Sequence, residues 1–265
     1  LLARWCGFGR LGSVLIGLIV AISLLGWFGI QNAIFAKSLD VALGNRLGFG
    51  WSAALSGSVL TILVTFGFRA LRIAARIAVP LFIALVGWVS WVTLSGHNLH
   101  QALQLAPAGD ALSISAGITI VVGGAIVASL MTPDLTRYSR NSGQVLGITL
   151  LTIVAGEFII NGLAILIAKS LGTDDVVSIM SLGAGGLGMM VVVFSTLRVN
   201  DLNLYSSSLG IVNAVEGLTG YKWRYAPTTL VIGVLGTTLS VLGILDRFVD
   251  FLTVLGVVFP PVIGI

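Results

Sequence analysis

The stretch LGAGGLGMMVVVFSTLRVNDLNLYSSSLGIVNAVEG, from Leu182 to Gly217, decides the class of fold. It begins as a glycine-rich apolar segment and becomes apolar again at its end. Between these parts, nine residues contain the polar side chains Ser195, Thr196, Arg198, Asn200, Asp201 and Asn203. Charged side chains are costly inside a bilayer, and those that occur there face protein or water. Arg198 and Asp201 therefore mark a pathway or a binding site inside a membrane protein.

The composition of the whole chain agrees with this interpretation. Of the 265 residues, 57% are hydrophobic and only 9% are charged, whereas about 25% are charged in a typical soluble domain. The net charge of +4 comes from basic residues scattered at segment ends, so it indicates no nucleic-acid partner. The single cysteine, Cys6, excludes an internal disulfide, and His97 and His100 resemble loop residues. We predict no metal site and no cofactor.

Hydropathy predicts an all-α membrane protein in which about eight helices cross the bilayer, because a span needs roughly 20 apolar residues. No linker or soluble segment separates the spans, so residues 1–265 are expected to form one transmembrane transporter domain, truncated at both ends. The expected spans are Leu11–Ala36, Gly50–Phe68, Ile73–Leu94, Leu112–Met131, Val145–Leu171, Gly183–Val215, Thr228–Leu245 and Phe248–Ile265.

The distribution of basic residues supports this count, because cytoplasmic loops carry an excess of Lys and Arg. With eight spans, one side holds the nine residues Arg4, Arg10, Arg69, Arg72, Arg76, Arg137, Arg140, Lys222 and Arg224. The other side holds the four residues Lys37, Arg46, Lys169 and Arg247. An error of one span would remove this asymmetry.

The first span contains a candidate substrate site. Trp27 lies near its middle, and Gln31 follows one turn later on the same face. Trp27 is either a packed core residue or a flat wall against which a flat ligand stacks. Gln31 either hydrogen-bonds the edge of such a ligand or joins two helices.

The fourth span contains the paired glycines Gly123 and Gly124, followed by Ala125. Glycine weakens a helix, and it is tolerated in a membrane where the backbone approaches another helix or a ligand closely. Both explanations stay open. The second would place Gly123 and Gly124 at the opening of a binding site.

The fifth span contains Glu157, with Asn161 four residues later. An isolated carboxylate at that depth would cost several kcal/mol, so Glu157 is expected to be protonated, paired or exposed to water. We predict an ion pair between Glu157 and Arg198. This pair is either a static bridge or part of a coupling site in which Glu157 exchanges protons. The expected length of the sixth span also predicts that it tilts, breaks or leaves the bilayer, with Asn200 and Asp201 bonding the backbone at a break.

The motifs of hydrolases, zinc enzymes and nucleotide-binding proteins are missing from the sequence, so we do not expect an enzyme. Broken helices and polar groups at mid-bilayer depth are typical of secondary transporters instead.

Several motifs together resemble the nucleobase–cation symporter family, which includes cytosine and purine-cytosine permeases. In chain order they are LLARWCGFG, GWFG at Gly26–Gly29, MTPDLTRYSRN at Met131–Asn141, VNDLNLYSSSLGI at Val199–Ile211 and FPPVIGI. The resemblance implies a leucine-transporter-type fold of two inverted five-helix repeats, usually within twelve helices. The eight spans would then be family helices three to ten.

The resemblance assigns site roles unevenly. The resemblance implies that Trp27 corresponds to a family tryptophan that stacks on one face of the base. The aromatic residue that stacks on the other face in the family is replaced by Ala125. A family glutamine is replaced by Leu24, and Gln31 would compensate for it. The sodium-binding positions fall at Ser195, Arg198 and Val199. A valine supplies no side-chain oxygen and a guanidinium repels a cation. This suggests that Arg198 replaces the sodium ion and that Glu157 couples transport to protons.

We therefore expect a multi-pass permease of the plasma (inner) membrane. It would import a nucleobase or a similar flat N-heterocycle, coupled to a proton rather than to sodium. The alternative is a non-transporting membrane sensor or a decayed paralogue of the same fold, which the changes at Ala125 and Arg198 favour.

Overall fold

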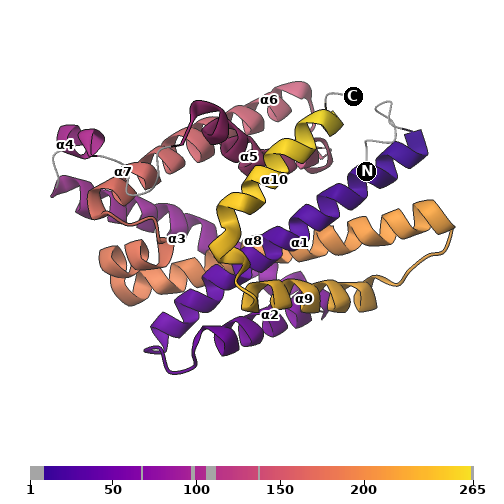
Figure 1. The fold of residues 1–265 in the computed structure, drawn as a ribbon, viewed down its shortest axis with the longest axis horizontal. Coiled ribbons are helices and arrows are strands. Elements are labelled where there is room, and N and C mark those ends of the chain that lie inside the picture. The colour runs from indigo at the N-terminus through magenta and orange to yellow at the C-terminus, as the bar shows by residue number, and fades with distance from the viewer. Residues whose placement is uncertain (1–8, 67, 97–98, 106–111, 137, 264–265) are drawn as a thin grey trace.

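A computed structural model of the chain describes residues 9–66, 68–96, 99–105, 112–136 and 138–263 (Figure 1). These residues are almost entirely helical and contain no β-strand, which confirms the all-α class. The elements are α1 (Gly9–Ala42), α2 (Phe49–Phe66), α3 (Phe68–Ser95), α4 (Leu99–Gln104), α5 (Ile114–Thr136), α6 (Ser142–Leu151), the π-helix η2 (Thr152–Ile160), α7 (Asn161–Leu171), α8 (Val176–Thr219), α9 (Tyr225–Val241), the 3₁₀-helix η3 (Ile244–Arg247) and α10 (Phe248–Ile263).

Every expected span contains a helix, but not every helix is long enough to cross a bilayer alone. Within the described ranges, five helical stretches are long and apolar enough, or six if α9 and α10 form one broken span. The expected count of eight is thus corrected at two places. In the third expected span, the part described in side-chain detail is a shorter apolar helix, Pro80–Ser95. In the last two expected spans, α9 and the η3–α10 stretch are bent by 78° about a short break. Gly243 adopts a left-handed conformation there, with φ of 81°, which ends the helix. Six of the thirteen basic residues used to count spans lie outside the part that can be described in side-chain detail: Arg4, Arg10, Arg69, Arg72, Arg76 and Arg137.

Helices α1 and α8 lie side by side through the centre of the molecule (Figure 1). Small residues permit this close approach, because Gly210 of α8 faces Ala21 and the Gly17 carbonyl of α1. The buried Ser207 hydroxyl donates to the Ala21 carbonyl at 2.7 Å, and the buried Asn200 amide donates to the Phe28 carbonyl at 3.1 Å. Polar side chains of α8 thus hold it against α1, as expected where no water competes for hydrogen bonds.

The expected break in α8 exists, but not at Asn200 and Asp201. It lies at Gly185, whose φ of 53° and ψ of −135° are not helical. Glycine adopts this conformation readily because it has no Cβ. Asn200 instead serves the contact with α1, so the prediction that it bonds exposed backbone at the break is wrong.

Helices α2 and α9 pack through reciprocal glycine–threonine contacts. Gly57 of α2 faces Thr237, and Gly233 of α9 faces Thr61, so each threonine fills the space left by a glycine. Both threonine hydroxyls donate to the glycine carbonyl of their own helix at 2.7 Å. Each threonine presents both its hydroxyl oxygen and its methyl group to the facing glycine, and such contacts of small residues bring membrane helices together.

Three helices meet at the buried side chain of Asn32. Its amide nitrogen donates to the Ala53 carbonyl of α2 at 3.0 Å and to the Ser240 hydroxyl of α9 at 3.1 Å. Its amide oxygen accepts from the Ser56 hydroxyl of α2 at 2.7 Å. Asn32 is 0% exposed, and all its polar atoms have partners. This junction fixes α1, α2 and α9 as one unit.

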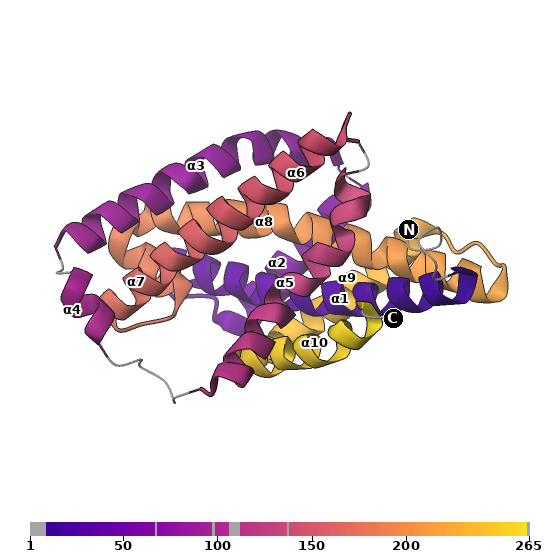
Figure 2. The same cartoon turned by 90° about the horizontal axis from the view of Figure 1, so that it is seen from above.

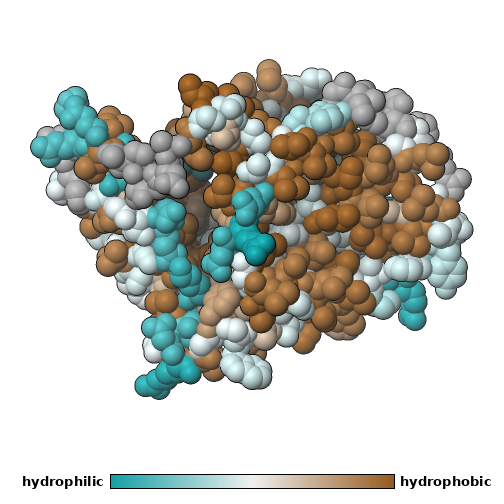
Figure 3. All heavy atoms as spheres, viewed as in Figure 1, coloured by the Kyte–Doolittle hydropathy of each residue, from teal (hydrophilic) through white to brown (hydrophobic). Residues whose placement is uncertain are grey.

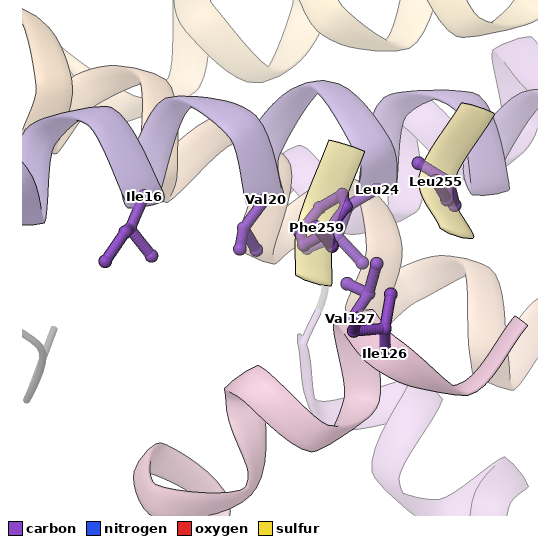
Figure 4. Close-up of a cluster of buried hydrophobic side chains, with 7 residues drawn as sticks. All are labelled: Ile16, Val20, Leu24, Ile126, Val127, Leu255 and Phe259. Carbon is purple, nitrogen blue, oxygen red and sulfur yellow. The ribbon is translucent and has the colours of Figure 1, made fainter. Parts of the chain in front are cut away.

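Helices α5 and α10 form a second unit on the other side of α1. Figure 2 shows α10 at one edge of the molecule and α3 at the opposite edge, with α5 beginning beside α10 and running through the middle. An apolar cluster attaches the pair to α1, as Figure 4 shows with Ile16, Val20, Leu24, Ile126, Val127, Leu255 and Phe259. Outside these contacts the surface is strongly apolar, and in Figure 3 hydrophobic residues cover a broad continuous area. Such a surface suits contact with lipid.

An ion pair joins the end of α1 to the start of α8, just outside the spanning part of α8. The Lys37 ammonium lies 2.9 Å from the Asp175 carboxylate, which also caps α8 by accepting from the Ser178 backbone N–H. Burial opposes ionisation of Asp175, but the bonds from Ser178 and Lys37 outweigh it and hold its pKa below the usual value. The ionised carboxylate is thus the form that joins the two helices.

Candidate functional site

A cavity of about 680 Å³ lies where α1, α3, α7 and α8 meet. Its walls are mainly apolar: Ile34 from α1, Phe82, Val86 and Val89 from α3, Ala164 and Ile167 from α7, and Val176, Ile179 and Met180 from α8. Val192 and Val199 of α8, Phe248 of α10 and Ile160 of η2 complete them. The polar residues on the walls are Gln31, Asn161, Ser195, Thr196 and Arg198. Apolar walls with a few polar groups are typical of a small-molecule site.

Arg198 is the cationic residue of this cavity wall, and its guanidinium forms an ion pair with Asp201. The two residues are three apart on α8, a spacing that places side chains on the same helix face. Asp201 is almost fully buried beneath the pair, with its side chain 5% exposed, while that of Arg198 is 39% exposed. The arginine thus remains accessible from the cavity, with its charge compensated by the aspartate behind it.

The predicted ion pair between Glu157 and Arg198 is not formed. Glu157 lies in η2 on an exposed face, and its Oε2 accepts a hydrogen bond from the Asn161 Nδ2 at 3.0 Å. Arg198 finds its partner three residues away on its own helix, so no carboxylate from another helix is needed. Asn161 lines the cavity together with Arg198, whereas Glu157 does not.

The hydroxyl groups of Ser195 and Thr196 bond to their own helix. Ser195 donates to the Val191 carbonyl at 2.7 Å, and Thr196 donates to the Val192 carbonyl at 2.6 Å. Both side chains lie on the cavity wall, so their oxygens keep acceptor capacity toward a ligand. Of the expected coupling residues, the cavity brings together Ser195 and Arg198.

Trp27 does not line this cavity, although Gln31 does. The Trp27 ring meets the edges of two phenylalanines of α10, Phe248 at 5.8 Å and Phe251 at 5.7 Å between ring centroids. The interplanar angles are 76° and 82°. Phe248 lies on the cavity wall, so this phenylalanine contacts Trp27 and also lines the cavity. In this conformation Trp27 makes packing contacts, and its role in stacking a substrate stays a prediction.

The adjacent glycines of α5, Gly123 and Gly124, have different surroundings. Gly123 packs directly on α10, because a Cβ there would overlap the Leu252 carbonyl oxygen. Gly256 of α10 likewise approaches the Thr119 carbonyl. A Cβ on Gly124 would meet no atom within 4 Å. Gly123 therefore makes a helix contact, and neither glycine nor Ala125 lines the cavity between α1, α3, α7 and α8.

This difference gives a matched pair of substitutions. Gly123→Ala is expected to lower the free energy of unfolding by about 1–3 kcal/mol, because the backbone of α10 must move to admit a methyl group. Gly124→Ala is expected to be neutral or slightly stabilising, since alanine favours a helix by up to about 1 kcal/mol. Thermal unfolding in detergent measures both. Equal midpoints for the two variants would contradict the close contact between α5 and α10.

Two cavity residues could not be singled out from the sequence alone. Asn161 was visible only as a polar residue four positions after Glu157. Phe248 carried no distinguishing signal, because a phenylalanine in an apolar span is ordinary. Only the packing of α7 against α3 and α8, and of α10 against α1, places them at the cavity.

The apolar helices indicate a multi-pass membrane protein, and the cavity between four of them has the walls expected of a small-molecule site. Residues 2–265 match the family described as "permease for cytosine/purines, uracil, thiamine, allantoin", and the chain belongs to that family. This confirms the resemblance to nucleobase–cation symporters.

Two relatives show how far the similarity extends. The chain is 31% identical over 268 residues to the cytosine permease of Escherichia coli (strain K12), covering 100% of this chain and 61% of the relative. It is 24% identical over 278 residues to the hydantoin permease of Microbacterium maritypicum, covering 89% of this chain and 55% of the relative. The chain thus spans a little over half of the length of these relatives, which are named as permeases rather than enzymes.

Proposed function

We propose that the full-length protein is a secondary active transporter that imports a nucleobase or a similar flat N-heterocycle across the plasma (inner) membrane. The observation that carries this proposal is the cavity beside Gln31, Asn161 and Arg198 in a member of a permease family. A flat heterocycle has apolar faces and hydrogen-bonding edges. The apolar walls suit its faces, and the two amides and the guanidinium suit its edges.

The fold that we propose for the full-length protein is the leucine-transporter type, with this chain supplying one membrane domain as helices three to ten. The central pair α1–α8 and the separate pair α5–α10 are compatible with such a division into packed groups of helices. Secondary transporters alternate access by moving such groups around a site near the middle of the bilayer.

We further propose that the coupling ion is a proton rather than sodium. Arg198 stands at a position that the family resemblance assigns to sodium binding, and its permanent charge disfavours a metal cation nearby. Asp201 compensates that charge from the same helix. Glu157, bonded to Asn161 at the cavity wall, is the carboxyl group that would exchange the proton.

Uptake into proteoliposomes of the full-length protein tests both proposals. Labelled cytosine, uracil, hypoxanthine and hydantoin are each offered with either a proton gradient or a sodium gradient alone. We expect accumulation of at least one base with the proton gradient and none with the sodium gradient. Accumulation driven by sodium alone would overturn the coupling proposal and leave the transport proposal standing.

The second candidate is a non-transporting sensor or decayed paralogue. Two observations favour it: Ala125 offers no aromatic ring, and Trp27 is engaged by Phe248 and Phe251. The same proteoliposomes decide between the two functions. A base that binds the protein without any flux or exchange would support the sensor and overturn the transporter.

A further inference from the structure

The hydrogen bond between Asn161 and Glu157 suggests how a proton and a substrate can affect each other's binding, if the chain serves the proposed function. Glu157 lies in the π-helix η2, and Asn161 is the first residue of α7. π-Helical turns are rare and often occur at functional sites. The Asn161 amide contacts the Glu157 carboxylate at 3.0 Å, and Asn161 also lines the cavity. The Asn161 side chain therefore contacts Glu157 and also lines the cavity.

An asparagine amide has two different ends, a donor NH₂ and an acceptor oxygen. An ionised carboxylate is an acceptor only, so it binds the NH₂ end, which is the arrangement in the structure. A protonated carboxyl group gains an O–H donor and can donate to the amide oxygen. Protonation of Glu157 can therefore reverse the Asn161 amide and change the end that faces the cavity.

No other charged side chain described near Glu157 competes for this role. The α3 side chains from Pro80 to Ser95 include no charged residue. On the segment from Ser142 to Leu171, the other charged residue is Lys169, which bonds the Leu103 carbonyl at 2.9 Å. On α8, Arg198 is paired with Asp201. On α1, Lys37 is paired with Asp175.

We propose that Asn161 couples protonation of Glu157 to substrate binding, by presenting its NH₂ group to a ring carbonyl oxygen of the substrate only when Glu157 is protonated. This deepens the proposed function and rests on it. The proton passes from water to the exposed Glu157 carboxylate and returns to water after release, and no bond of the substrate changes. Because coupling is reciprocal, a bound carbonyl-bearing base favours proton binding equally. Asn161 is thus a specificity residue, and Glu157 acts through it.

The test uses labelled cytosine, which carries a ring carbonyl, and the full-length protein in proteoliposomes. The KM for exchange is measured at equal pH on both sides of the membrane, from pH 4 to pH 9, so that the series includes the ordinary range of a carboxyl group. In the unaltered protein the KM is expected to rise about tenfold from the lowest to the highest pH, which is within the usual range of coupling between two sites.

Two variants separate this coupling from a merely structural role. Glu157→Gln presents a permanent donor to Asn161, so its KM is expected to stay at the low-pH value throughout. Asn161→Leu removes the NH₂ group, so its KM stays at the high-pH value. Asn161→Gln, which keeps the amide, should restore part of the pH dependence. Thr152→Val is the control, because Thr152 bonds only the Ile148 carbonyl of its own segment among the contacts found, and its profile should match the unaltered protein.

The outcomes distinguish the two proposals. A pH-dependent KM in Asn161→Leu, or a pH-independent KM in the unaltered protein with exchange intact, overturns the coupling alone. Absence of exchange in the unaltered protein overturns the proposed transport function, and the coupling falls with it. Thermal unfolding of each variant shows whether a change in KM reflects loss of the fold.

Discussion

Replacing Arg198 with methionine is expected to lower the free energy of unfolding by about 3 kcal/mol. Asp201 is almost fully buried, and its ion-pair partner would be lost. Removing one member of a buried pair typically costs about 3–5 kcal/mol, because the other charge stays uncompensated. The lower end of that range applies here, since Arg198 itself is partly open to the cavity. Unfolding in detergent at neutral pH measures the loss.

The relative stabilities of three variants test whether the loss of the ion pair causes this destabilisation. Asp201→Asn leaves Arg198 beside the cavity, where water can solvate it, so this change should cost less than Arg198→Met. The double variant Arg198→Met, Asp201→Asn should recover part of the loss, since no charge is left uncompensated. A double variant that is less stable than Arg198→Met alone would show that the ion pair is not the cause.

Replacing Asn32 with leucine is expected to destabilise the protein by a similar amount, about 3 kcal/mol. The change removes the bonds to Ala53, Ser56 and Ser240, each worth about 1 kcal/mol net. It also leaves polar groups of α2 and α9 with fewer partners in a buried site. The loss should appear as a lower midpoint of unfolding in detergent.

The neighbouring residue provides the control for Asn32. Gln31 lies on the cavity wall rather than at the junction, so Gln31→Leu should change the free energy of unfolding by less than about 0.5 kcal/mol. The same variant should weaken uptake of a base, because an amide of the proposed site is lost. Equal destabilisation by both variants would contradict the separation between junction and cavity.

The sequence predicted the class of fold well because hydropathy is a local property. Runs of apolar residues predict membrane helices wherever they fold, and each expected span contains a helix. The boundaries were less predictable. The turn at Gly243 joins α9 and α10 at a sharp bend, and the break in α8 falls at Gly185, one of several glycines in that segment. Which glycine adopts a non-helical conformation depends on the packing of the helices around it.

The sequence alone determined that this protein is a bundle of membrane helices with charged residues inside its apolar segments, at Glu157, Arg198 and Asp201, because hydropathy and charge are properties of the residues themselves. Only the tertiary structure decided their partners. Asp201 neutralises Arg198 within one helix, and Asn161 connects Glu157 to the cavity. It also separated Trp27 and Gly123, which pack against α10, from Gln31, which reaches the cavity. Two residues four positions apart on α1 meet different neighbours, and the neighbours are set by how distant helices cross.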